Sequence, residues 1–183
     1  MRIGAFFVAA CAAAAGALPV TPAHAQASAE AVKAAFLPKF ARYVEFPAGA
    51  QPGPGQPFYL CLIGRDPFGA AIDHAAASET IDGHAVAVRR FAGTDAAAVS
   101  GCHVAYVAGG SASQSAQMLA ALRRQSTLTV TDSRWGSARG MIHFIVAGGR
   151  VRFNIDNAAA ASRGIAISSR LLALAVEVKQ PRP

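Results

Sequence analysis

The residues of this sequence that could support chemistry are its cysteines, its histidines and the aspartates that follow apolar runs. Beyond the N-terminal apolar segment the cysteines are Cys61 and Cys102. In an oxidising compartment two cysteines usually form a disulfide, which here would close a loop of about 40 residues. The alternative is two buried free thiols that pack as small apolar side chains. The sequence leaves both states open.

The histidines do not form a metal-binding pattern. Four of them follow residue 26, namely His74, His84, His103 and His143. No two are spaced as in H-x-x-x-H. Cys102 and His103 are adjacent, so in a strand their side chains would point to opposite faces and would not share one ion. We therefore expect no metal and no other cofactor.

Common catalytic motifs are also missing from the sequence. Gly109-Gly110-Ser111 lacks the glycine spacing of a dinucleotide-binding loop and the lysine of a P-loop, and no G-x-S-x-G motif occurs. Asp66 precedes Pro67, a pair that is typical of a helix start. Because no acid, base and nucleophile are brought together by these patterns, we expect that the protein is not an enzyme.

The elements that must position these residues alternate between strands and helices. The expected strands are the apolar runs 58–64, 84–91, 102–108 and 127–131, and the expected helices are 67–77 and 113–125. This alternation implies parallel pairing through right-handed crossovers. In the common doubly wound order the first and third strands are neighbours, which would bring Cys61 close to Cys102.

Residues 28–46 predict a helix that packs on this sheet. Its apolar stripe consists of Val32, Phe36, Phe40 and Tyr43, and we expect its aromatic side chains to lie in the core. Pro38 lies within this segment and removes one helix hydrogen bond. The helix should therefore either kink there or divide into two pieces.

The stretch 141–175 is the most regular part of the sequence. Its two apolar runs, 141–147 and 150–155, flank Gly148-Gly149, which is typical of a two-residue hairpin turn. A short helix is expected after Asn157, and residues 171–178 are apolar at helical spacing. We predict an α/β fold, a three-layer domain with a mixed, mainly parallel sheet and a C-terminal antiparallel hairpin.

Length and composition indicate one exported domain. The chain has 183 residues, of which 53% are hydrophobic, and this suffices for one sizeable core. Residues 1–25 are typical of a secretory signal peptide, with Arg2 before an apolar stretch and Ala23-His24-Ala25 as the cleavage site. We expect a single domain over residues 26–183, located in the periplasm and not inserted in the membrane after cleavage.

The basic charge of the chain does not indicate a nucleic-acid partner. The formal net charge is +7, but only 15% of the residues are charged and no four basic residues are consecutive. Aromatic residues are not interleaved with the basic ones as in RNA-binding surfaces. We therefore expect an ordinary solvated surface and no nucleic acid.

Six short motifs, in order along the chain, are similar to those of one protein family. They are VKAAFL (32–37) with FARYVEFP (40–47), CLIGRDPFG (61–69), VAVRR (86–90), CHV (102–104), LTVTD (128–132) and the stretch 140–175 from GMIHF to LLALA. With these motifs the chain resembles the YfiR-like family of small exported bacterial proteins, which is defined by the DUF4154 domain. The resemblance covers nearly all of the chain after residue 25.

The resemblance implies a regulatory role. Members of this family are exported regulators, and such a protein represses a membrane-bound diguanylate cyclase by binding its periplasmic sensor domain, which lowers cyclic-di-GMP. The paired cysteines of the family match Cys61 and Cys102, and disulfide formation is part of the regulation. A homodimer is a further candidate assembly. A second cysteine pair, which some members carry around the hairpin, is missing here.

Two kinds of binding site remain as hypotheses. The first is a partner-binding surface in the short apolar segment with basic neighbours near the C-terminus, formed by Arg163, Ile165, Ile167 and Arg170. The second is a small-ligand site in the crevice at the carboxyl ends of the strands, where open α/β sheets bind ligands. The positions at those ends are Arg65 with Asp66, residues 109–111 and residues 132–134.

Overall fold

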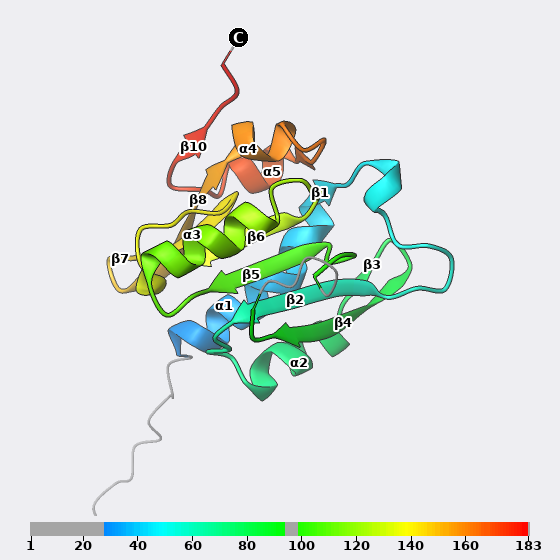
Figure 1. Cartoon of the computed structure of the whole chain (residues 1–183), viewed down its shortest axis with the longest axis horizontal. Coiled ribbons are helices and arrows are strands. Elements are labelled where there is room, and N and C mark those ends of the chain that lie inside the picture. The colour runs from blue at the N-terminus through cyan, green and yellow to red at the C-terminus, as the bar shows by residue number, and fades with distance from the viewer. Residues whose placement is uncertain (1–27, 94–98, 183) are drawn as a thin grey trace, which may run out of the picture.

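An eight-stranded sheet forms the centre of the computed structural model, which describes residues 28–93 and 99–182 (Figure 1). Its strand order is β10 (Val178–Lys179), β8 (Arg150–Asp156), β7 (Ile142–Ala147), β6 (Leu128–Asp132), β5 (Val104–Ala108), β2 (Phe58–Gly64), β4 (His84–Phe91) and β3 (Thr80–Ile81). The five strands from β7 to β4 are parallel, and β8 and β3 are antiparallel to their neighbours β7 and β4. The predicted mixed, mainly parallel sheet is confirmed, whereas the expected signal peptide lies outside the described residues.

Helices cover both faces of this sheet. The helices α1 (Ala29–Phe40) and α2 (Ala70–Ala77) lie on one face, and α3 (Ala112–Ala121) lies on the other (Figure 1). Alternate residues of β2 show the division, because Leu60 and Leu62 pack towards α1 and α2 whereas Cys61 and Ile63 pack towards α3. This is the predicted three-layer arrangement. Among the described residues no helix has the length and hydropathy needed to cross a membrane.

The helix α1 is continuous through Pro38. The proline lies in its last turn, and the chain passes directly into the 3-10 helix η1 (Ala41–Tyr43). Phe40 makes an edge-on contact with Phe153 at a centroid distance of 5.3 Å, so this part of the aromatic stripe packs in the core as expected. Tyr43, in contrast, is 38% exposed, because the chain leaves α-helical geometry before this residue.

Helix α2 begins later than the sequence predicts. Asp66 accepts hydrogen bonds from the backbone N–H groups of Phe68 and Gly69, and the helix starts only at Ala70. Gly69 has a positive φ of 51°, which places a turn between Pro67 and the helix. The carboxylate of Asp66 also accepts a hydrogen bond from Arg90 of β4 at 2.8 Å. Its structural role is thus to fix the turn after β2.

The C-terminal unit begins with the predicted hairpin. Gly148 and Gly149 both have positive φ and connect β7 to β8 as a two-residue turn. The short helices α4 (Asn157–Ala161) and α5 (Ser169–Leu172) flank β9 (Ala166–Ile167), which pairs with β1 (Val44–Glu45) in a separate two-stranded sheet. The helix suggested by the spacing of residues 171–178 is therefore wrong beyond Leu172, since the chain then forms β10 beside β8.

Candidate functional site

Cys61 and Cys102 form a disulfide bond between the sheet and the turn before β5. Their Cα atoms are 5.8 Å apart, and both side chains are buried against Met118 and Leu122 of the α3 layer. The bond is possible because β2 and β5 are neighbours in the sheet, as the doubly wound order predicts. Of the two states left open by the sequence, the structure contains the disulfide. Cys102 itself precedes β5, which starts two residues later than expected.

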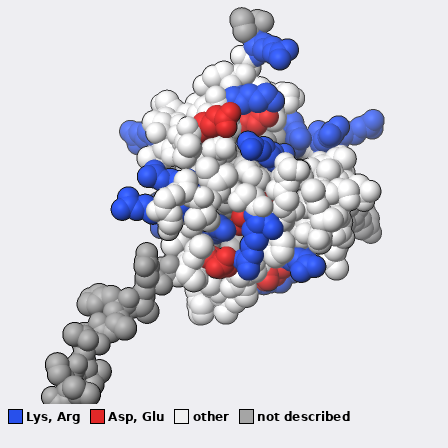
Figure 2. Space-filling view, turned by 90° about the vertical axis from the view of Figure 1, so that its left-hand side faces the viewer, with Lys and Arg blue, Asp and Glu red and all other residues white. Residues whose placement is uncertain are grey.

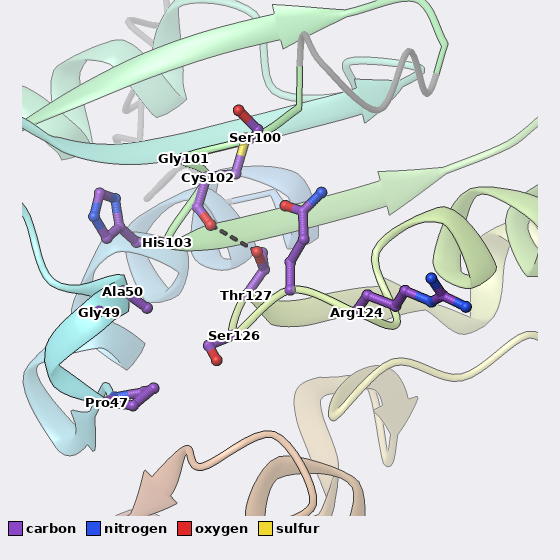
Figure 3. A pocket seen from close by; sticks show the side chains of 11 residues that line it. Pro47, Gly49, Ala50, Ser100, Gly101, Cys102, His103, Arg124, Ser126 and Thr127 are labelled. Carbon is purple, nitrogen blue, oxygen red and sulfur yellow. Dashed lines mark hydrogen bonds between the residues drawn. The ribbon is translucent and has the colours of Figure 1, made fainter.

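A cavity of about 570 Å³ lies beside this disulfide, at the amino ends of β5 and β6 (Figure 3). The labelled side chains of Pro47, Ala50, His103, Arg124 and Ser126 come from three segments that surround it. The first of these contains the 3-10 helix η2 (Ala48–Ala50). The hydroxyl of Thr127 donates a hydrogen bond to the carbonyl of Cys102 at 2.7 Å, which joins the start of β6 to the disulfide.

His103, which lines this cavity, is a buried neutral histidine. Its ring stacks on Phe58 at a centroid distance of 4.5 Å, and its Nδ1 accepts a hydrogen bond from the backbone N–H of Tyr59 at 2.9 Å. Burial lowers the pKa of the imidazole below its ordinary value. The proton of the neutral ring is therefore on Nε2. Within residues 28–93 and 99–182 no group of three or more His, Cys, Asp or Glu side chains could hold a metal ion.

Packed side chains fill part of the region at the carboxyl ends of the strands, where we expected a crevice. The amino end of α1 covers β6 there, and Lys33 Nζ donates to Asp132 Oδ2 at 2.6 Å. Beside this pair, Nε1 of Trp135 in the 3-10 helix η3 (Ser133–Trp135) donates to the hydroxyl of Tyr106 at 2.8 Å. Burial raises the pKa of Tyr106 above its ordinary value. Helix α1 and Trp135 thus fill the part of this region beside Tyr106 and Asp132, and a small-ligand site at the strand ends stays a prediction.

Of the four residues predicted to form one partner-binding surface, Ile167 and Arg170 line one groove, and Arg163 lines a different cavity. Ile165 is 1% exposed and Ile167 is 9% exposed, so both belong to the core. Arg163 is partly buried beside α3 and α4, whereas Arg170 is exposed on α5. Ile165 therefore offers a partner almost no surface, whereas Ile167 lines the same groove as Arg170, and a partner contact through these residues stays a prediction. The alternation of the two isoleucines with exposed Ala166 is the two-residue period of the short strand β9.

Arg170 lies in a groove of about 480 Å³, which we call the β1–β9 groove. Three segments distant in sequence build it, namely residues 41–45, Asp82 and residues 166–170. The β1–β9 ladder holds the first and last of these together, and Ser168 N–H donates to the carbonyl of Tyr43 at 2.9 Å. Cationic and anionic side chains both line the groove, namely Arg42, Arg170, Glu45 and Asp82.

Sequence reasoning missed Tyr43 and Asp82 as members of this groove. Tyr43 lies at the end of an apolar helical stripe, and this pattern predicts a core position for it. Asp82 has a positive φ of 48° in the turn between β3 and β4, which is uncommon for a residue other than glycine. In the sequence, Asp82 and the glycine after it predict a turn. They do not predict which other segments this turn contacts in the fold.

The basic side chains are dispersed over the face shown in Figure 2. Lys and Arg groups occur in several separate places there, and acidic groups are fewer and lie among them. Several of the cations form ion pairs, such as Arg134 with Glu30 at 2.6 Å and Lys179 with Asp156 at 2.9 Å. This distribution fits the expectation of a solvated surface.

Comparison with known proteins identifies the family of the chain. A family model described as YfiR/HmsC-like matches residues 30–176, which extend from the first turn of α1 to beyond α5. No curated protein matches the chain. Because the family match covers far more than half of the sequence, the chain belongs to the YfiR/HmsC-like family.

Proposed function

We propose that this protein is a periplasmic regulatory binding protein that represses an inner-membrane diguanylate cyclase. It would bind the periplasmic sensor domain of the cyclase and thereby lower cyclic-di-GMP and biofilm formation. The observation that carries the proposal is the family match over residues 30–176. On this proposal the protein acts by binding the cyclase, and residues 1–25 would direct its export. Fractionation of cells that express the full chain tests the location, and retention in the cytoplasm would contradict it.

The β1–β9 groove is the part of the surface that we assign to the partner. Tyr and Arg are enriched at the energetic centres of protein interfaces, and the groove presents Tyr43 and Arg170 together. Arg42 is held by Glu79 at 3.2 Å, whereas Arg170 has no ion pair among the described residues. Arg170 can therefore pair with a carboxylate of a partner without first breaking an internal contact.

The test measures binding of the mature chain to the purified periplasmic domain of an inner-membrane diguanylate cyclase from the same cells. Arg170→Glu should weaken this binding about tenfold or more, because an attractive charge becomes repulsive. The control is Arg124→Glu, another exposed arginine, which lines the cavity beside the disulfide. Equal binding by the Arg170→Glu variant and the unaltered chain would exclude the groove.

Deletion of the gene tests the function itself. Cells without the protein should contain more cyclic-di-GMP and form more biofilm, and the unaltered gene should restore both. An unchanged cyclic-di-GMP level after deletion would contradict the proposed function, whatever the result of the binding test with Arg170→Glu. The expected homodimer is a separate prediction, which sedimentation of the purified chain decides.

A further inference from the structure

Three arginines from separate elements line one small cavity under α3. Arg123 follows α3, Arg139 lies in the loop before β7, and Arg163 follows α4. The cavity has a volume of about 270 Å³, and part of its wall is formed by apolar side chains such as Leu119, Met141 and Ala159. We call it the arginine cavity. It lies apart from the β1–β9 groove, and the two have no lining residue in common.

The positive charge of this cavity is not balanced within the described part of the chain. None of the three guanidinium groups has an ion pair among residues 28–93 and 99–182. Asp156 also lines the cavity, but its two oxygens already accept hydrogen bonds from the N–H of Ala159 at 2.8 Å and from Lys179 at 2.9 Å. Three guanidinium groups therefore line the cavity with a single carboxylate, and that carboxylate is paired with Lys179.

Arg163 shows this imbalance at the level of a single atom. Its Nη1 is buried and has no hydrogen-bond acceptor among the described residues. Burial, with a smaller contribution from the charge of Arg123, lowers the pKa of this guanidinium. A buried charged donor without an acceptor is strongly disfavoured, and proteins normally satisfy it with a partner group. An anion that enters the cavity would relieve the repulsion between Arg123 and Arg163, which both line it.

We propose that the arginine cavity binds a small organic anion, in which a carboxylate or phosphate group is joined to a short apolar body. The planar guanidinium fork matches the geometry of both kinds of oxyanion. The apolar wall would contact the body of the ligand, and the volume restricts that body to about the size of one ring. This inference goes beyond the regulatory function and does not depend on it.

Calorimetric titration of the purified mature chain tests the proposal with three probes, phenyl phosphate, benzoate and inorganic phosphate. We expect phenyl phosphate or benzoate to bind, and Arg163→Gln and Arg123→Gln each to weaken that binding about tenfold or more. Arg124→Gln is the matched control. It alters an exposed arginine next to Arg123 that lines the other cavity, and it should leave binding unchanged.

Thermal unfolding separates ligand binding from a structural role. Arg163→Gln removes a partly buried charge that has no ion pair among the described residues, so the Tm of the ligand-free chain should stay the same or rise. If the Arg163→Gln variant does not fold, titration of Arg123→Gln, which alters an exposed residue, tests the proposal instead. Absence of binding to any probe, or equal weakening in Arg124→Gln, overturns the proposal. Inorganic phosphate binding as tightly as phenyl phosphate would indicate an adventitious ion only and would overturn the organic ligand.

Discussion

Lys33 Nζ lies 2.6 Å from Asp132 Oδ2, and both side chains are 3% exposed. This buried ion pair joins α1 to the carboxyl end of β6, across 99 residues of sequence. The second oxygen of Asp132 accepts a hydrogen bond from the N–H of Arg134 at 3.0 Å, which orients the carboxylate. The pair therefore fixes α1 at the carboxyl end of β6.

Lys33→Met should destabilise the fold by about 3–5 kcal/mol, because it leaves the carboxylate of Asp132 buried without a cation. The free energy of unfolding in urea measures the effect. Lys39→Met is the control, since Lys39 is exposed on the same helix and should change stability by less than about 0.5 kcal/mol. Equal stability of the two variants would show that the buried pair contributes little.

Loss of the disulfide should also destabilise the chain. The bond joins residues 41 positions apart, and in the chain-entropy model a loop of this length contributes about 4 kcal/mol. The double variant Cys61→Ala/Cys102→Ala should lose at most this amount in urea unfolding. Reductant should lower the stability of the unaltered chain and have no effect on the double variant. An effect of reductant on both proteins would contradict this explanation.

The buried histidines should make the fold less stable in mild acid. Burial lowers the pKa of His103 and of His143, so the unfolded chain binds their protons at a higher pH than the folded chain. Stability rises with pH wherever the unfolded state binds more protons. The free energy of unfolding should therefore have its full value above about pH 6.5, the ordinary pKa of histidine. It should fall as the pH drops towards the pKa values of the two histidines in the folded chain.

Urea unfolding at a series of pH values from about 7.5 to about 5 measures this slope. His103→Gln should flatten the slope, because it removes one of the two described histidines whose pKa is lowered by burial. His74→Gln, which alters an exposed residue of α2, is the control and should leave the slope as it is. An identical slope in all three proteins would exclude His103 as a source of the acid sensitivity.

The sequence predicts the sheet well because the signals for it are local. Gly148-Gly149 permits the positive φ of a tight turn, and the continuous apolar run of β2 requires burial on both faces. The strand order then follows from general rules of parallel sheets, and it brings Cys61 near Cys102. Turn chemistry and periodicity suffice for these features.

The candidate sites depend on contacts that local signals do not contain. Burial of Lys33 is decided by Asp132, and Tyr43 is exposed because the chain changes to a 3-10 turn after Phe40. The basic and apolar composition of residues 163–170 suggested one surface. The structure instead divides this segment between two cavities and the core, since a two-residue strand turns alternate side chains inwards.

That division gives a prediction that separates folding from partner binding. Ile165→Ala should destabilise the fold by about 2–5 kcal/mol, because it removes core atoms that are 1% exposed and leaves a cavity. Arg170→Glu should leave the free energy of unfolding within about 0.5 kcal/mol of the unaltered chain, since its side chain is exposed and has no ion pair among the described residues.

The two variants should affect binding to the sensor domain in the opposite order to their effects on stability. At a temperature where Ile165→Ala remains folded, its affinity should equal that of the unaltered chain, whereas Arg170→Glu should bind about tenfold more weakly or worse. Urea unfolding and titration of the sensor domain, carried out on the same preparations, measure both quantities. Loss of affinity by folded Ile165→Ala with full affinity of Arg170→Glu would place the partner contact away from the β1–β9 groove.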